Sequence, residues 1–212
     1  MKTLLVTGGT GGLGTTVVER LSHDYRCVLL TREPEGESSL QADLSDEASV
    51  RAAVAAAVAR FGAPYGLVHM AGGYAGGVLS QTATEAWQSM IGLNLTSSFF
   101  ILREAMQAMR HDAPGRIVAI SSIATLSRSA GSAAYQIAKG GLNTLIQVAA
   151  AELAGTPITA NALLPDTLDT PASRKAMPDA RRVPLASVAE TIVFLLSEEA
   201  ANVNGALIPL PA

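Results

Sequence analysis

Four polar side chains have the types and the order that proton transfer to a carbonyl oxygen requires. Tyr135 and Lys139 stand four residues apart, and side chains at that spacing project from one face of a helix, so that an ammonium lies beside a phenol and favours its phenolate. Ser122 precedes the tyrosine by thirteen residues, on a predicted strand, and can reach the same point, while Asn94 lies further upstream. A phenol in this setting is a usable proton donor or acceptor near neutral pH.

A tyrosine and a lysine at this spacing also occur on exposed helix faces without any catalytic role. The glycine-rich turn Thr7–Gly14 argues against that alternative, because it joins a predicted strand to a predicted helix, as a dinucleotide-binding turn does. Gly8 permits the tight turn, Gly12 lets the backbone approach a pyrophosphate, and Gly14 allows the helix to pack closely. A plain flexible loop is the other interpretation. The residues of this turn predicted to bind the cofactor are Gly8, Thr10, Gly11, Gly12, Leu13 and Gly14.

The end of the second predicted strand indicates which dinucleotide is bound. Thr31–Arg32 stands where an acidic side chain would bind the ribose diol of NAD(H). Arg32 offers a planar fork suited to a ribose 2′-phosphate, which favours NADP(H) over NAD(H). Glu33 and Glu35 would repel that phosphate, so a solvated surface arginine is the alternative. After the third predicted strand, Asp43–Leu44 is expected to contact adenine through the carboxylate, which could equally cap the next helix.

Composition limits the class of protein. The chain has 212 residues, 49% of them hydrophobic, and a formal net charge of -3 at pH 7, so we expect one catalytic domain over residues 1–212 and no nucleic-acid partner. The first apolar residues are too few for a signal peptide, and no apolar run approaches the roughly 18 residues of a spanning helix. We therefore expect a cytoplasmic protein with no membrane partner. We predict no metal site, and Cys27, the only cysteine, is expected to be a small core residue.

Short apolar runs alternate with longer segments of helical period, which is typical of a parallel sheet covered by helices on both faces. We predict an α/β fold of Rossmann-like form, with a three-layer, doubly wound parallel sheet of about seven strands. The strands are expected near residues 2–7, 26–31, 39–42, 65–71, 115–121, 157–164 and 205–209. The helices are expected near residues 12–23, 46–61, 82–110, 132–154 and 186–198.

Capping residues support the boundaries of two of these helices, and one connection departs from the alternation of strands and helices. Ser45 and Asp46 can begin the helix that Gly62 closes, and Thr82 with Glu85 forms a capping-box pattern. Only the segment 32–38 separates the second and third strands, too short for a crossover helix. We predict a loop there, which leaves part of one sheet face uncovered or covered by a neighbouring subunit.

Together these residues resemble the classical short-chain dehydrogenase/reductase (SDR) family over essentially the whole chain. The family's TGxxxGxG pattern matches Thr7–Gly14, its helix asparagine matches Asn94, and its catalytic serine and YxxxK pair match Ser122, Tyr135 and Lys139. Two motifs are altered. The strand-four NNAG appears as His69-Met-Ala-Gly72, and the PGxxxT motif appears as Pro165-Asp-Thr-Leu-Asp-Thr170, with Asp166 in place of the glycine.

The resemblance implies an oxidoreductase that transfers a hydride between NADP(H) and a carbonyl or alcohol substrate. Tyr135 would be the general acid or base and Ser122 would orient the substrate oxygen. Lys139 would hold the nicotinamide ribose and lower the pKa of the tyrosine, and Asn94 would hold a water that resupplies protons. His69 replaces a structural asparagine, so a structural role is favoured over that of a base. The resemblance adds cofactor contacts at Ala71, Gly72, Gly73, Pro165, Thr167 and Thr170.

The substrate side is expected to be mostly apolar, with Tyr74, Ile123 and Ala130 beside Ser122 and Tyr135. A short substrate lid is expected near residues 170–184. It carries four basic residues, Arg174, Lys175, Arg181 and Arg182. These form either a solvated basic loop or a docking patch for an acyl carrier protein or an anionic substrate. By the resemblance we also expect a homotetramer or homodimer, built partly through the helix that holds Tyr135.

Two other functions remain open. One is a catalytically silent dinucleotide-binding protein, a redox sensor or scaffold, which would bind cofactor without turnover. The intact set of Ser122, Tyr135, Lys139 and Asn94 argues against it. The other lies within the enzyme class and is an NADH-dependent dihydropteridine-reductase-like enzyme, which the short lid and the missing crossover helix suggest.

Overall fold

Seven strands form one parallel sheet in the order β3-β2-β1-β4-β5-β6-β7. The computed structural model describes residues 1–127 and 129–212. The strands are β1 (Lys2–Thr7), β2 (Tyr25–Thr31), β3 (Ser39–Gln41), β4 (Gly66–His69), β5 (Gly115–Ile120), β6 (Ile158–Pro165) and β7 (Leu207–Leu210). The chain runs from β1 to one edge of the sheet and then returns to build the other, so the order reverses between β1 and β4. In such sheets a crevice opens at the carboxyl ends of the strands at this point.

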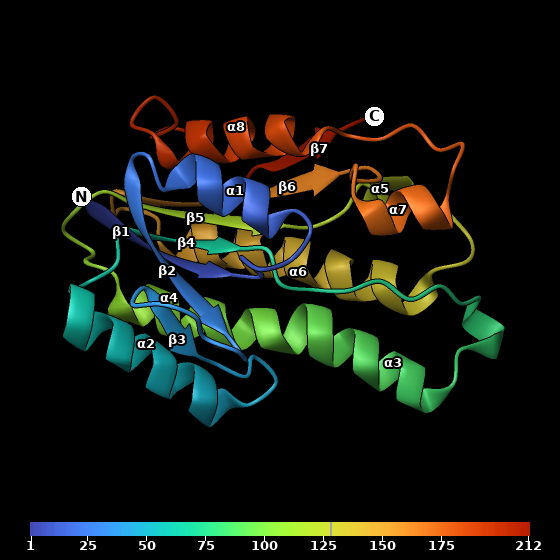
Figure 1. Ribbon diagram of the computed structural model, residues 1–212, viewed down its shortest axis with the longest axis horizontal. Coiled ribbons are helices and arrows are strands. Elements are labelled where there is room, and N and C mark those ends of the chain that lie inside the picture. The colour runs from blue at the N-terminus through green and yellow to red at the C-terminus, as the bar shows by residue number, and fades with distance from the viewer. Residues whose placement is uncertain (128) are drawn as a thin grey trace.

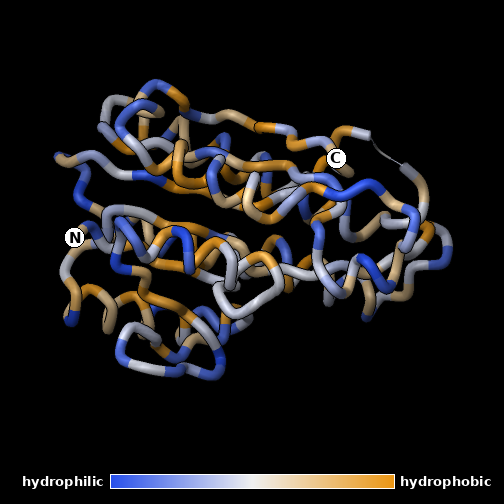
Figure 2. Tube along the Cα trace, turned by 45° about the horizontal axis from the view of Figure 1, so that its top comes forward, coloured by the Kyte–Doolittle hydropathy of each residue, from blue (hydrophilic) through white to orange (hydrophobic). Residues whose placement is uncertain are grey.

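Helices cover both faces of the sheet, which confirms the predicted three-layer α/β fold (Figure 1). On one face lie α1 (Gly14–Leu21) and α8 (Leu185–Leu196). On the other lie α2 (Glu47–Phe61), α4 (Ser97–Ala108) and α6 (Ala133–Glu152). Because both faces are covered, β5 and β6 are buried at every position. Figure 2 shows apolar residues concentrated along the strands, between the helical layers. Cys27 is buried in the core on the α1 side, as predicted.

The glycine-rich turn between β1 and α1 is closed by contacts that only glycine permits. Gly8 has φ of 71°, in the left-handed region, and an added Cβ there would lie 2.6 Å from the Ala71 nitrogen. At Gly14 an added Cβ would lie 2.0 Å from the Gly8 carbonyl oxygen. The start of α1 therefore packs directly on the turn. No side chain caps this helix start. The Thr15 nitrogen donates to the Gly11 carbonyl at 3.1 Å, which leaves the other N–H groups of the first turn for an anion.

The single helix predicted over residues 82–110 is wrong in its middle. The structure has α3 (Thr84–Ile91), a π-helical turn η2 (Gly92–Thr96) and then α4. Ser97 Oγ donates to the Leu93 carbonyl at 2.7 Å and Ser98 Oγ donates to the Asn94 carbonyl at 2.8 Å. Such bonds from serine to the preceding turn bend helices. The bulge places Asn94 inside the protein, fully buried.

The predicted helix caps are confirmed for α2 and are wrong for the helix expected to begin at Thr82. Asp46 begins α2, where its carboxylate accepts a hydrogen bond from the Ala48 nitrogen at 3.1 Å, and Gly62 ends it with φ of 80°. The predicted capping box at Thr82 is wrong. Its hydroxyl donates to the Val78 carbonyl instead, at 2.9 Å, across the short 3-10 helix η1 (Leu79–Gln81).

Two short helices were not predicted, α5 (Ala124–Ser127) and α7 (Pro171–Ala176). Helices of this length show no apolar period in the sequence. Both lie beyond the carboxyl ends of the strands (Figure 1). The predicted loop between β2 and β3 is confirmed, since no helix forms over residues 32–38. Across the described residues, the model contains no helix with the length and apolar character needed to cross a membrane.

Candidate active site

Tyr135 and Ser122 meet where the first turn of α6 passes the end of β5. The backbone beyond β5 stays aligned with β6, because the Ile123 nitrogen donates to the Pro165 carbonyl at 3.1 Å. This fixes Ser122, whose hydroxyl lies close enough to the Tyr135 phenol to lower its pKa. The Tyr74 ring lies edge-on to Tyr135, with 5.1 Å between the ring centroids. The structure thus brings together three of the residues predicted to contact substrate.

The electrostatic setting of Tyr135 differs from the expectation. Burial raises its pKa above the ordinary 10.0, the hydrogen bond with Ser122 lowers it in part, and nearby Tyr74 adds to the rise. Lys139 donates instead to the Ile120 carbonyl at 2.8 Å. Burial lowers the pKa of this lysine from 10.5 to about 8. In the protein chain alone, the pKa of Tyr135 is therefore shifted by burial, Ser122 and Tyr74, while the Lys139 ammonium bonds to the backbone.

Asn94 and Lys139 converge on Gly72, just after β4. An added Cβ at Gly72 would lie 2.7 Å from Asn94 Oδ1 and 3.1 Å from Lys139 Nζ. Asn94 Oδ1 accepts a hydrogen bond from the Gly73 nitrogen at 3.1 Å, and its Nδ2 donates to the Met90 carbonyl at 3.2 Å. The asparagine thus fixes the backbone at the end of β4 and joins it to the π-helical turn.

His69 is buried behind this site, only 2% exposed. Its Nδ1 lies 2.7 Å from Thr7 Oγ1 and its Nε2 lies 2.8 Å from Ser98 Oγ. Because the Ser98 proton is donated to the Asn94 carbonyl, Nε2 must donate and Nδ1 must accept, which is the neutral tautomer. Burial lowers the pKa of His69 to about 3, and the charge of Lys139 adds to the effect. The structural role is the one the environment supports.

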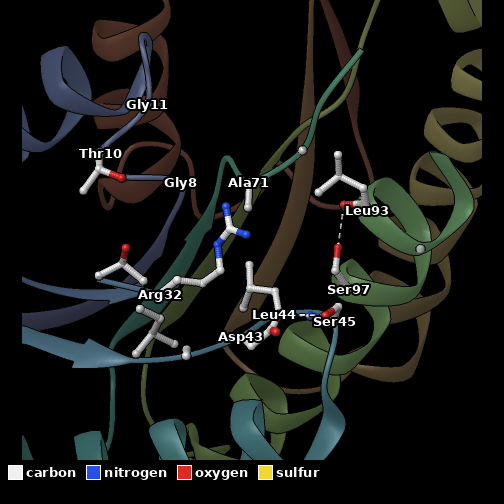
Figure 3. Close-up of a pocket in the computed structure, with 15 residues that line it drawn as sticks. Gly8, Thr10, Gly11, Arg32, Asp43, Leu44, Ser45, Ala71, Leu93 and Ser97 are labelled. Carbon is white, nitrogen blue, oxygen red and sulfur yellow. Dashed lines mark hydrogen bonds between the residues drawn. The ribbon is translucent and has the colours of Figure 1, made fainter. Parts of the chain in front are cut away.

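A cavity of 420 Å³ lies at the switch point of the sheet (Figure 3). Nine of the predicted cofactor residues line it: Gly8, Thr10, Gly11, Thr31, Arg32, Asp43, Leu44, Ala71 and Gly72. Six lining residues were missed: Leu30, Ala42, Ser45, Gly92, Leu93 and Ser97. Ser45 could have been predicted to line the cavity, because it lies only two residues after the predicted cofactor residue Asp43. Leu93 and Ser97 could not, because only the π-helical turn brings them to the cavity.

Arg32 extends across this cavity from the end of β2 (Figure 3). It also lines a second cavity of 500 Å³, together with Thr10, Glu33, Glu35 and Ser39. None of the ion pairs found in residues 1–127 and 129–212 involves Arg32. Ser39 is only 8% exposed and its hydroxyl has no hydrogen-bond partner among the described residues. This second cavity lies beside the loop that replaces the crossover helix.

Other predicted cofactor residues do not line these cavities, and their observed contacts are with neighbouring segments of the chain. Gly12 faces the Thr170 methyl group, which would lie 3.1 Å from an added Cβ. The Leu13 side chain is buried in the core on the α1 side, so only its backbone could reach a cofactor. The Thr167 carbonyl accepts a hydrogen bond from the Val183 nitrogen at 2.8 Å.

Two acidic residues of uncertain role form local turns. Asp43 accepts hydrogen bonds from the Ser45 hydroxyl at 2.7 Å and the Ser45 nitrogen at 2.9 Å, and the hydroxyl bond is the largest cause that lowers its pKa. Asp166 Oδ1 accepts from the Thr167 nitrogen at 2.7 Å. The carboxylate that replaces the family glycine thus folds onto its own turn. Ala130 is exposed just before α6.

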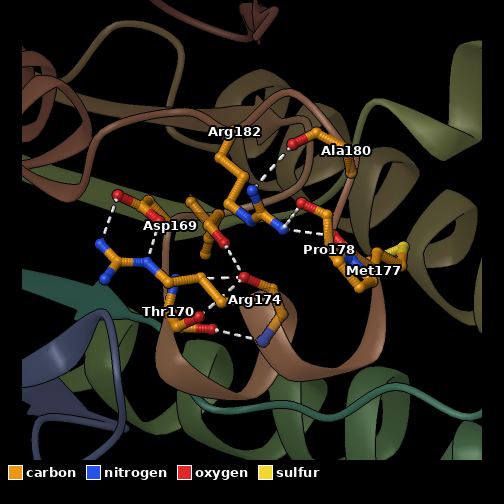
Figure 4. Close-up of polar contacts among 9 residues, drawn as sticks. Asp169, Thr170, Arg174, Met177, Pro178, Ala180 and Arg182 are labelled. Atoms are coloured by element: carbon orange, nitrogen blue, oxygen red, sulfur yellow. Dashed lines mark hydrogen bonds and ion pairs between the residues drawn. The ribbon is translucent and has the colours of Figure 1, made fainter.

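The segment predicted as a lid is held by its own polar contacts (Figure 4). Thr170 and Ser173 form a capping box at the start of α7. Arg174 pairs with Asp169 at 2.7 Å, and Arg182 donates to the carbonyls of Met177, Pro178 and Ala180. Two of the four basic side chains therefore serve the segment itself, while Lys175 and Arg181 are exposed.

The doubly wound sheet, the glycine turn and the cavity at the switch point define a dinucleotide-binding protein. A family model described as short chain dehydrogenase matches residues 2–181. The chain is 30% identical to the 3-oxoacyl-(acyl-carrier-protein) reductase MabA of Mycobacterium tuberculosis, over 99% of this chain and 91% of that protein. It is also 30% identical to the reductase FabG of Escherichia coli, over 96% of this chain and 93% of that protein.

Solved structures agree with this assignment. A short-chain dehydrogenase/reductase from Mycobacterium ulcerans superposes with a TM-score of 0.92 at 27% identity, over 99% of this chain and 88% of that one. The actinorhodin polyketide ketoreductase with NADPH superposes with a TM-score of 0.90 at 28% identity, over 99% of this chain and 95% of that one. The chain belongs to the short-chain dehydrogenase family. It is an NAD(P)-dependent oxidoreductase that acts on carbonyl or hydroxyl groups, so the catalytically silent alternative is not retained.

The buried neutral His69 predicts a loss of stability in acid. Its folded pKa of about 3 lies below the ordinary 6.5, so between these pH values the unfolded chain binds a proton that the folded chain does not. The free energy of unfolding should therefore fall as the pH falls through this window, by at most about 1.4 kcal/mol per pH unit from this group. When the free energy of unfolding is measured by urea at several pH values in this window, it should depend less steeply on pH for His69→Asn than for wild type. Exposed His23→Asn is the control, and equal slopes for wild type and His69→Asn would contradict the prediction.

Proposed function

We propose that this chain is an NADP(H)-dependent carbonyl reductase in which Tyr135 is the general acid. The observation that carries the proposal is the convergence on Gly72, which lines the dinucleotide cavity and abuts both Asn94 and Lys139. Lys139 stands one helical turn after Tyr135 on α6, and Tyr135 interacts with Ser122. A cofactor in the cavity would thus extend toward the tyrosine, with the lysine and asparagine between them.

The residues fit a bound dinucleotide, because the turn has a glycine at each point of close approach and no side chain caps the start of α1. The nicotinamide, when bound, supplies or accepts the hydride. The chain handles the oxygen of the substrate. Ser122 Oγ accepts a hydrogen bond from the Ala124 nitrogen at 3.2 Å, so its own proton can be donated to that oxygen. Tyr135, kept protonated by its raised pKa, delivers a proton there.

Lys139 serves the same step from beside the tyrosine. Its pKa of about 8 keeps it largely charged at neutral pH. The ammonium would hold the hydroxyls of the nicotinamide ribose near Gly72. Asn94 holds the backbone at Gly73 in place.

Arg32 supports NADP(H) over NAD(H). It lines both cavities and forms no ion pair among the described residues. An anion in the cavity would pair with this guanidinium, and a ribose 2′-phosphate has the required oxygens. Two similar solved structures, the actinorhodin polyketide ketoreductase and ElxO, contain NADPH and NADP, respectively. Glu33 and Glu35 border the second cavity and limit the gain in affinity.

Tyr135→Phe is expected to lower kcat for NADPH-dependent reduction by about 10²–10⁴-fold, because it removes the general acid but keeps the ring. The affinity for NADPH, followed by fluorescence, should stay nearly unchanged. Lys139→Ala should lower both kcat and the affinity for NADPH. Tyr25→Phe, which removes a hydroxyl that contacts the Leu196 carbonyl at 3.3 Å, is the control. Full activity of Tyr135→Phe would remove the proposed acid from the mechanism.

Arg32→Ala is expected to raise KM for NADPH by about tenfold or more, the loss of a charge-assisted hydrogen bond, while KM for NADH changes little. Arg26→Ala, an exposed position on the same strand, controls for the loss of a positive charge. If wild type prefers NADH, the preference for NADP(H) fails and the NADH-dependent dihydropteridine-reductase-like alternative gains support.

The substrate could be an acyl thioester carried on an acyl carrier protein. The similar MabA and FabG proteins are named for that substrate, and the exposed Lys175 and Arg181 lie on the lid segment. Acyl carrier proteins are acidic, so these two cations would form the docking patch. The other two basic residues of the segment, Arg174 and Arg182, are held by contacts within it.

The double variant Lys175→Glu with Arg181→Glu tests this docking. It is expected to raise KM for a 3-oxoacyl-acyl-carrier-protein by about tenfold, through loss of charge attraction, and to leave KM for a small uncharged 3-oxoacyl thioester unchanged. Arg60→Glu, at an exposed position on α2, controls for net charge. An unchanged KM for the carrier-protein substrate would reject the docking patch without affecting the role of Tyr135.

A further inference from the structure

The carbonyl of Ser122 is held by the residue three positions further along the chain. It accepts hydrogen bonds from the Thr125 nitrogen at 3.2 Å and from Thr125 Oγ1 at 2.8 Å. Because the Thr125 hydroxyl gives its proton to Ser122, this hydroxyl can only accept from its other neighbour. That neighbour is Asn143 Nδ2, at 2.9 Å. The bonds run in one direction, from Asn143 through Thr125 to Ser122.

This relay joins the two segments that carry the proposed catalytic groups. Asn143 lies on α6, one turn beyond Lys139, and is 6% exposed. Thr125 belongs to α5, which follows directly on Ser122. A second bond, from Ser121 Oγ to the Lys139 carbonyl at 3.3 Å, links the same two segments. The position of the serine is therefore tied to the helix that holds Tyr135.

The relay holds the backbone of Ser122, and a separate bond from the Ala124 nitrogen engages its hydroxyl. Ser122 lies beyond the last residue of β5 and is only partly buried, so packing alone does not fix it. Its carbonyl is held by Thr125, and its Oγ accepts from the Ala124 nitrogen at 3.2 Å. With both acceptors engaged from α5, the hydroxyl proton is left to point away from α5.

We propose that Thr125 and Asn143 are positioning residues that hold the Ser122 hydroxyl toward the Tyr135 phenol and the substrate oxygen. The inference rests on the proposed function, in which Ser122 orients that oxygen. Neither residue touches the reacting atoms. They act through Ser122, and the alternative is that their hydrogen bonds only stabilise α5.

Thr125→Val removes the hydroxyl and keeps the shape of the side chain. We expect kcat for NADPH-dependent reduction to fall by about tenfold, the value of one well-placed hydrogen bond, with KM for NADPH unchanged. Thr125→Ser retains the hydroxyl and should restore the rate. Asn143→Leu should cause a smaller loss in the same direction. Thr144→Val is the matched control, because its exposed hydroxyl donates to the Gly140 carbonyl at 3.3 Å on the same helix.

A double-mutant cycle separates positioning from stability. If Thr125 acts through Ser122, Thr125→Val should have no further effect on kcat in a Ser122→Ala background. The alkaline limb of kcat/KM should also move to higher pH in both single variants, because the hydrogen bond with Ser122 lowers the pKa of Tyr135. Tyr74 and Lys139, the other titratable groups beside the phenol, are unchanged in each protein. Independent effects on kcat, or a limb that stays in place, would overturn the proposal.

Crystal structures of wild type and Thr125→Val give a readout that does not depend on turnover. The Ser122 and Tyr135 hydroxyls should be hydrogen-bonded in wild type and apart in the variant. If no carbonyl substrate is reduced but the hydroxyls separate, the proposed function fails and the positioning stands. If reduction occurs and the hydroxyls stay bonded in the variant with kcat unchanged, the positioning is wrong and the proposed function stands.

Discussion

The arrangement of the site depends on one buried cation. Lys139 is 5% exposed and donates to the Ile120 carbonyl at the end of β5. Burying an ammonium is costly unless polar groups surround it, and the lowered pKa of about 8 reports that cost. The Ile120 carbonyl and the nearby Asn94 Oδ1 supply the negative ends of dipoles that keep it charged. Three elements, β5, α6 and the π-helical turn, are thereby held to one point.

A second layer of neutral polar groups lies behind that cation. His69 joins Thr7 of β1 to Ser98 of α4, and Ser98 passes its proton to the Asn94 carbonyl. Thr7, His69 and Ser98 are hydrogen-bonded to one another, which is the condition for burying polar groups without a large penalty. A charged histidine here would stand against Lys139, so its neutrality is part of the same electrostatic arrangement. The network fixes the bulged helix, and with it the wall of the dinucleotide cavity.

At the edge of the sheet, by contrast, the missing crossover helix between β2 and β3 leaves space open. A helix there would cover the α1 side of these strands, and the loop over residues 32–38 leaves the space beside Ser39 open. Arg32, at the start of this loop, reaches both that space and the main cavity. The short connection therefore borders a polar recess next to the main cavity.

The sequence by itself determined the seven strands and the glycine turn. Strands of a parallel sheet buried on both faces appear as short apolar runs, and the close contacts at Gly8 and Gly14 admit no other residue. It also predicted Ser122, Tyr135 and Lys139 as the catalytic residues, from their types and spacing. Only the tertiary structure decided the break at Asn94, the recess at Ser39 and the relay from Asn143. These features arise from contacts between residues far apart in the chain, which local propensity and periodicity do not encode. The same reason explains why the pKa of Tyr135 rises, since burial is a property of the fold and spacing along a helix gives only the distance to a charge.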